Sequence, residues 1–422
     1  MSATYEWVRS TLKEIGMSPA IFIIFFALLL QWSSATAGEL DHYLAILDEH
    51  PSIKRILQEK EALEFQADGA LGLPDPVISL GVENVPLWDP SFDQYLPSSK
   101  TIGFSQNIPN PNQRKAQQDA IRQSAESQRL LAEYRRSRLY ALFYTKLAEY
   151  KRIGEQLAIE EKKRRVIGEL KQFYEGEVFA GEPVFQKTFS IDLELSDVEK
   201  SINDLSAESQ MVEANFIQLV GEVPGPVVVN HNEKIWSGQT EALFPVLLAQ
   251  QNSRVADERI KVANAEFKPD FGLAAVYKNR EDGENNTFDG DDWFSLQFRM
   301  SIPLWASSNQ KPKLAAARSR KRSALYNYED VQRSWQMQMT NIESKKEASR
   351  RNIVTLNNKR VALEESLEAL TSTYGSGQTS LEPSLLTELS RLSLLSRIAK
   401  EEETYIRNLQ EANAHIQTGK TP

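Results

Sequence analysis

The residues that could do chemistry are few in this 422-residue sequence, and they form no catalytic constellation. The absence of cysteine excludes disulfides, thiolate metal sites and cysteine nucleophiles. The four histidines, at positions 42, 50, 231 and 415, are scattered and lack metal-ligand spacing. The carboxylates Glu175, Glu177 and Glu182 are more informative, because they cluster around Gly176. The sequence therefore predicts no enzyme, no cofactor and no metal centre, and the role of the carboxylates depends on the elements that hold them.

Two pairs of alternating segments, expected as β-hairpins over 76–109 and 270–303, lie at matching places in the two halves of the chain. In each of them apolar residues take every second position, as in Ile78-Ser79-Leu80-Gly81-Val82-Glu83 and Phe294-Ser295-Leu296-Gln297-Phe298-Arg299. Strict alternation gives a strand one apolar and one polar face. It assigns Glu83 and Arg299 to the polar face. Half-buried strands of a soluble sheet are the simpler interpretation of the alternation alone.

A very long helix is expected after each hairpin, over 112–173 and 313–374, because both stretches lack proline. Each would extend for roughly 90 Å at 1.5 Å per residue. Apolar residues recur there at spacings of three and four, which is typical of coiled-coil seams. Helices of this length do not fit into a compact globule, so we expect them to pack side by side within the chain or between chains.

The order of elements predicts an internal duplication. The first repeat, 38–223, contains a helix, the first hairpin, the first long helix and a helix over 183–220. The second, 224–422, contains a helical connector, the second hairpin, the second long helix and a helix over 381–418. Gly221-Glu222-Val223-Pro224-Gly225-Pro226 marks the boundary between them, because glycine and proline end helices.

The amino-terminal residues 1–37 are expected to be a secretory signal peptide. The apolar run from Ala20 to Leu30 is followed by Ala35-Thr36-Ala37, which is a good cleavage site. Met17 is an alternative start to Met1, because the segment before the apolar run is long and its charges cancel. A single membrane anchor is the alternative, but eleven apolar residues are too few to span a bilayer. The net charge of −9 argues against nucleic acid as a partner.

Four strands of this length could cross an outer membrane at a tilt, but four strands cannot close a barrel. Several chains would have to contribute. Three chains would supply twelve strands, an even number with a usable lumen.

At these positions the chain resembles the TolC family of outer-membrane efflux channels, over nearly all of the mature sequence. The duplicated unit of two strands and a long helix is the broad signal. The local signals are segments that look like the flanks of the family's first hairpin and two aromatic-x-x-Gly patterns at the ends of the long helices: Leu73-Pro74-Asp75-Pro76, Gly81-Val82-Glu83-Asn84, Phe104-Ser105-Gln106-Asn107-Ile108-Pro109, Phe173-Tyr174-Glu175-Gly176 and Tyr374-Gly375-Ser376-Gly377.

The resemblance implies a TolC-like fold that is mainly α-helical with a small β part. It implies a homotrimer in which four strands from each chain form a shared 12-stranded β-barrel in outer-membrane lipid, while long antiparallel coiled-coil helices form a periplasmic tunnel. The partners would be a periplasmic adaptor protein and an inner-membrane pump. Gly176 and Gly377 are then expected at the tips that contact the adaptor.

Relatives of this family usually carry an acidic residue six positions after each tip glycine, within the tunnel mouth. Glu182 stands at that position in the first repeat. The second repeat has Pro383 there, with Glu382 beside it. In a trimer, Glu175, Glu177, Glu182 and Glu382 would form rings of carboxylates, which favour cations and serve as gates. A solvated turn is the alternative for them. Glu83 and Arg299 would face the lumen and tune conductance.

These features predict a passive export conduit that has no activity of its own. The Pro-Asp-Pro and Ser-Gln-x-Ile-Pro segments look most like the heavy-metal branch of the family, the CusC and CzcC type, which would make the cargo a metal cation. Drug efflux and type I secretion remain open as alternatives. A periplasmic coiled-coil scaffold with a small soluble sheet is the alternative from a different class.

Overall fold

The computed structural model describes residues 40–180, 185–225 and 231–417. The expected signal peptide, 1–37, and the candidate gate residue Glu182 lie outside the described residues. Residues 40–48 are helical. The elements that follow are α3 (Pro51–Gly69), β1 (Val77–Glu83), β2 (Ser99–Ile108), α4 (Pro111–Phe179), α5 (Phe185–Val220), η1 (Thr240–Ala242), α6 (Phe244–Ala265), β3 (Phe271–Asn279), η2 (Glu284–Asn286), β4 (Trp293–Met300), α7 (Gln310–Gly375) and α8 (Glu382–His415).

The chain forms two compact units. The strand-bearing unit comprises Lys54–Glu133 and Gln239–Gln336. The helical unit comprises the described residues up to Ile53, those within Tyr134–Gly238 and those from Met337 onward. Each unit therefore takes residues from both halves of the sequence, and the long helices α4 and α7 contribute a segment to each.

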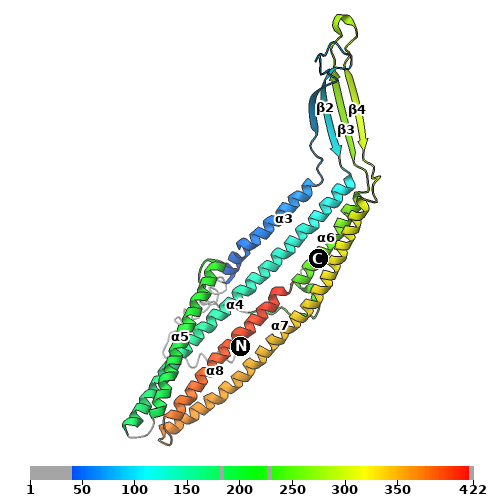
Figure 1. The fold of residues 1–422 in the computed structure, drawn as a ribbon. Coiled ribbons are helices and arrows are strands. Elements are labelled where there is room, and N and C mark those ends of the chain that lie inside the picture. The colour runs from blue at the N-terminus through cyan, green and yellow to red at the C-terminus, as the bar shows by residue number, and fades with distance from the viewer. Residues whose placement is uncertain (1–39, 181–184, 226–230, 418–422) are drawn as a thin grey trace, which may run out of the picture. The chain divides into compact units, whose positions relative to one another are not determined.

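The four strands form one antiparallel sheet in the order β1-β2-β3-β4 (Figure 1). The central pairing joins the two hairpins, with Phe104 opposite Ala275 and Gly103 opposite Val276. Because side chains alternate along each strand, this register extends each face of one hairpin directly into the same face of the other. The four strands expected from the sequence are confirmed as one antiparallel sheet.

One face of this sheet is apolar and open. Its large side chains are exposed by 77% at Leu80, 70% at Phe294 and 66% at Leu296. The same face also carries Ile78, Val82, Ile102, Phe104, Leu273, Phe298 and Met300, each of them at least 39% exposed. The opposite face carries mainly small and polar residues at the alternate positions of the same strands, together with Val77, Val276 and Trp293. An uncovered apolar surface of this size marks an interaction with a partner or a membrane.

The core of the helical unit lies where the amino-terminal helical residues, α4 and α5 meet. Phe143 of α4 is fully buried, and its ring centroid lies 5.7 Å from that of Tyr43 and 5.9 Å from that of Phe216. Leu47 and Val212 complete the contact from the two flanking segments. Aromatic rings at these separations add to the free energy gained by burial.

Both long helices extend beyond the ranges expected from the sequence. α4 continues from the expected end at residue 173 to Phe179. Gly176 does not end it, since a glycine inside a helix costs only about 1 kcal/mol relative to alanine. α7 begins at Gln310, before Pro312. A proline in the first turn is tolerated because its missing N–H would have no helical partner.

Among the described helices, none is both long enough and apolar enough to cross a membrane.

Candidate functional site

Three of the carboxylates singled out by the sequence, Glu175, Glu177 and Glu382, lie at the end of the helical unit where α4 and α7 end and α8 begins (Figure 1). We call this end the helical tip. A small apolar core holds it together, formed by Ile167, Leu170 and Tyr174 of α4, Ile191 of α5 and Leu385 of α8. These contacts bring α8 against the pair of α4 and α5.

Glu382 contacts two other helices of the tip. It accepts a 2.6 Å hydrogen bond from the Tyr174 hydroxyl and lies 2.9 Å from the Lys187 ammonium. The Lys187 ammonium also lies 4.9 Å from the centroid of the Tyr174 ring, a cation–π distance. We call these three residues the tip link, since they join α4, α5 and α8.

The tip link keeps Glu382 ionised. The hydrogen bond from Tyr174, and then the hydrogen bond and charge of Lys187, hold the pKa of the Glu382 carboxyl below its usual range. Burial, reinforced by the hydrogen bond to Glu382, raises the pKa of the Tyr174 hydroxyl. Glu382 is also in the first turn of α8, where the helix dipole favours a negative charge.

Two of the other candidate gate residues, Glu175 and Glu177, are not part of this link. Glu175 and Glu177 lie in the last turns of α4, with Glu175 exposed and Glu177 half-buried. The tip thus brings together one of the expected carboxylates, Glu382, with two residues that the sequence did not single out, Tyr174 and Lys187. Tyr174 belongs to the aromatic-x-x-Gly pattern, but the sequence offers no signal for the register that places it against α8.

The two tip glycines differ in structure. Gly377 has a φ of +72° and donates its N–H to the Tyr374 carbonyl, while the Gln378 N–H reaches the Thr373 carbonyl. These bonds form a Schellman motif that ends α7. Gly176 lies inside α4, and its carbonyl accepts a helical hydrogen bond from the Ala180 N–H. Gly176 is therefore part of the helix and does not form a turn.

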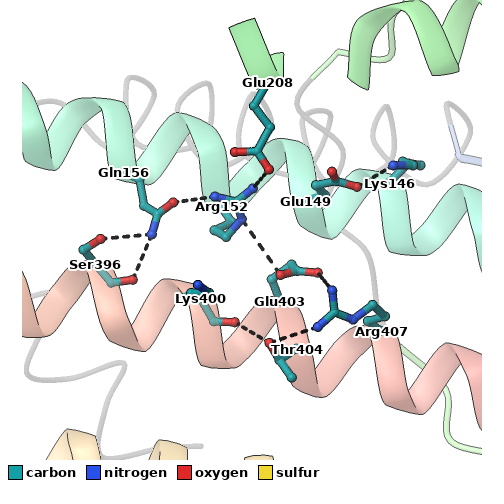
Figure 2. A network of polar contacts seen from close by, with 10 residues as sticks. All are labelled: Lys146, Glu149, Arg152, Gln156, Glu208, Ser396, Lys400, Glu403, Thr404 and Arg407. Carbon is teal, nitrogen blue, oxygen red and sulfur yellow. Dashed lines mark hydrogen bonds and ion pairs between the residues drawn. The ribbon is translucent and has the colours of Figure 1, made fainter. Parts of the chain in front are cut away.

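A second polar cluster, which we call the buried network, lies between α4, α5 and α8 of the helical unit (Figure 2). Its centre is Arg152, only 9% exposed, which donates to Glu208 of α5 and to Gln156 of its own helix. Arg152 also lies 3.9 Å from Glu403 of α8, which Arg407 approaches to 3.4 Å. The charges of the buried network are paired with one another, which suits a structural role, since an unpaired buried charge would destabilise the fold.

The candidate lumen residues Glu83 and Arg299 lie on the small, polar face of the sheet. Glu83 of β1 forms an ion pair with Lys278 of β3. Arg299 of β4 lies opposite Gly272 and donates to Gln297 over 3.3 Å. This face therefore carries charged side chains next to glycines, with Glu83 two residues from Gly81 and Arg299 opposite Gly272.

In the described parts of the chain, no three histidine, aspartate or glutamate side chains come together as a metal site would require. His415 instead bonds the Tyr134 hydroxyl at 2.8 Å, and His231 lies 3.2 Å from the Gln410 amide nitrogen.

Loss of the tip link should loosen the helical tip locally. Tyr174→Phe and Glu382→Gln are each expected to cost about 1 kcal/mol, because the first removes the donor of this partly exposed hydrogen bond and the second removes the charge of its acceptor. Hydrogen–deuterium exchange of peptides from 370–390 should quicken several-fold in both variants at pH 7. The double variant should show little further effect. Glu175→Gln is the control and should exchange at the wild-type rate.

The same contact should depend on pH. A carboxyl whose folded pKa is depressed contributes stability above its unfolded pKa and loses it as the pH falls through the folded value. The exchange-rate ratio of Glu382→Gln to wild type should therefore persist down to about pH 4.5 and approach one below it. A ratio that stays constant to pH 3 would contradict the ionic description of the link.

The buried network should be sensitive to loss of its central cation. Arg152→Met leaves the buried Glu403 carboxylate with less compensation, and it should destabilise the fold by about 3 kcal/mol. The measurement is the thermal unfolding midpoint. Lys151→Met, at the exposed neighbouring position, is the control. Adding Glu208→Gln and Glu403→Gln to Arg152→Met should recover part of the loss.

No protein-family profile matches the chain, and no curated protein is similar enough in sequence to match it. Solved structures are similar in fold. The outer membrane protein VceC of Vibrio cholerae has a TM-score of 0.70 at 16% identity, covering 90% of this chain and 97% of VceC. CusC, studied for transmembrane channel formation, has a TM-score of 0.70 at 14% identity, covering 89% and 92%. The open-state MtrE outer membrane channel of Neisseria gonorrhoeae has a TM-score of 0.69 at 15% identity, covering 88% and 87%.

These structures confirm the fold class expected from the sequence, which is mainly helical with a four-stranded antiparallel sheet. The chain has the TolC-like fold of outer-membrane channel proteins.

Proposed function

We propose that the protein is a passive channel in the bacterial outer membrane, through which an export system releases its cargo. The observation that supports this proposal is the sheet, whose two faces differ in polarity. Its apolar face is open along all four strands, while its other face carries mainly small and polar side chains. Lipid against the apolar face and a water-filled lumen against the polar face would give each face a favourable environment.

The assembly we propose is a homotrimer. The ladder of the sheet ends at β1 on one side and at β4 on the other within the chain. Exposed strand edges favour pairing with further strands. Three copies joined edge to edge would give twelve strands in a closed barrel, and the long helices would continue it into the periplasm as a tunnel.

The helical tip would then be the end that meets a periplasmic adaptor and an inner-membrane pump. Energy would come from the pump, because the conduit itself is proposed to have no catalytic role. In the trimer, the tip link of Tyr174, Lys187 and Glu382 would appear three times around the mouth. Glu175, Glu177 and Glu182 would add carboxylates to that mouth and favour cations there. Gly176 and Gly377 are proposed as part of the adaptor contact.

The proposed cargo is a heavy-metal cation. The support is the resemblance of the Pro74-Asp75-Pro76 and Ser105-Gln106-Asn107-Ile108-Pro109 segments to the metal branch of the TolC family, together with the acidic tip. The fold is equally similar to CusC and to VceC, so fold similarity does not favour one cargo class. Drug efflux is the competing proposal, and polypeptide secretion is a third.

The membrane assignment of the sheet can be tested with adjacent substitutions on opposite faces of β4. Leu296→Lys places a charge on the apolar face, where it should cost about 2 to 4 kcal/mol and prevent insertion into liposomes. Ser295→Lys is the control, because its side chain lies on the polar face. It should insert, form trimers in detergent and conduct ions in a planar bilayer. A monomer that stays soluble without detergent would instead support a periplasmic scaffold.

The cargo can be tested by growth. A strain that lacks this protein is grown on copper, silver, zinc, cobalt, dyes and antibiotics, with the complemented strain as the control. Sensitivity confined to metals is the expected result. Sensitivity to dyes or antibiotics with normal metal tolerance would contradict the metal proposal and favour drug efflux.

A further inference from the structure

The start of α7 and the segment before it are strongly basic. From Trp293 to Tyr328 there is no aspartate or glutamate, while there are seven lysines and arginines, at 299, 311, 313, 318, 320, 321 and 322. The whole chain carries a net charge of −9, so the positive charge of this segment is opposite in sign to that of the chain as a whole. Six of these cations fall within the first turns of α7. Electrostatic attraction to an anionic partner would therefore be local to this part of the strand-bearing unit.

Three of the cations form a stripe along α7. Lys311, Arg318 and Arg322 follow one another at spacings of seven and four, which places them on one face of the helix. All three are exposed. Within the described residues, none of the three forms an ion pair. By contrast, Lys313 pairs with Glu266 at 2.8 Å, and Lys321 pairs with Asp257. We call Lys311, Arg318 and Arg322 the cationic stripe.

The stripe follows directly after the apolar face of the sheet. β4 ends at Met300, and the Ser301 N–H donates to the Asp270 carbonyl at the start of β3, over 2.9 Å. Leu304 and Trp305, exposed by 74% and 77%, lie between the strand and the helix. The order along the chain is thus an apolar face, an exposed tryptophan and then cations. Aromatic residues at the interface followed by Lys and Arg toward the headgroups form the usual sequence of a membrane boundary.

The first repeat offers no equivalent stripe, although its long helix also begins with basic residues. There, Arg114 donates to the Leu71 carbonyl, Lys115 pairs with Asp119 at 2.9 Å, and Arg122 pairs with Asp68 at 3.3 Å. Because these cations already have partners, the surplus charge belongs to α7 alone. A duplicated element has therefore diverged in charge at the position next to the sheet.

We propose that the cationic stripe binds the phosphate headgroups of anionic phospholipids in the periplasmic leaflet of the outer membrane. This inference rests on the proposed membrane function of the sheet. The charge of the stripe matches such headgroups, and the two guanidinium groups provide the forked donors that bind phosphate oxygens in pairs. Each cation close to an anionic lipid surface strengthens binding about fivefold. Trp305 and Leu304 would rest at the level between the headgroups and the acyl chains.

The test uses the full chain in a neutral detergent, titrated with phosphatidylglycerol or with phosphatidylcholine of the same chain length. The readout is the lipid concentration that gives half of the maximal increase in the thermal unfolding midpoint. For the wild type, we expect this concentration to be at least about tenfold lower for phosphatidylglycerol. The preference should fall as salt rises. The triple variant Lys311→Gln, Arg318→Gln, Arg322→Gln should lose it.

The matched control removes three exposed cations from the same helix within the helical unit: Lys345→Gln, Arg351→Gln, Lys359→Gln. This variant should keep the wild-type preference. Equal responses to the two lipids in the wild type, or equal losses in both triple variants, would overturn the proposal. An equal response to glycerol phosphate at the same concentration would assign the stripe to a free anion and overturn the lipid assignment.

The same samples separate this inference from the proposed function. Insertion into phosphatidylcholine liposomes without any preference for phosphatidylglycerol would reject only the lipid site. Failure to insert into liposomes of either composition would reject the membrane function, and the lipid site with it.

Discussion

The pairing of β2 with β3 is the constraint on which the rest of the structure depends. These strands belong to different halves of the sequence, and their register sets Phe104 opposite Ala275. A slip of one residue would turn the apolar side chains of one hairpin onto the polar face of the other. With the observed register, the two hairpins together form one continuous apolar face, and exposing such a face to water is unfavourable. The sheet therefore requires an apolar environment on that face.

The helices have a related problem of register, because long amphipathic helices can slide past each other by whole turns at little cost in apolar contact. Specific polar contacts remove this freedom. In the helical unit, Arg152 of α4 bonds to Glu208 of α5 and lies near Glu403 of α8, while Gln156 of α4 donates to the Ser396 carbonyl and hydroxyl. Shifting any of these helices by one turn would leave a buried charge without its partner.

Much of the fold was accessible from the sequence because it depends on short-range patterns. Alternation in the segments around Leu80 and Leu296 predicted strands with one apolar face, and the lack of proline predicted α4 and α7. The ends were less certain, since Gly176 is helical while Gly377 is not, although both follow an aromatic residue at the same spacing. The tip link could not be predicted from the sequence, because Tyr174, Lys187 and Glu382 meet only through the packing of three helices.

The difference between Gly176 and Gly377 has a consequence for symmetry. The sequence repeat makes the two helical hairpins of a chain look alike, and a ring of three chains would then present six similar ends. One hairpin, however, continues as an α-helix through its glycine, whereas the other closes in a Schellman motif. In such a ring the six ends would alternate between two shapes, so a binding protein present in six copies would occupy two non-equivalent environments.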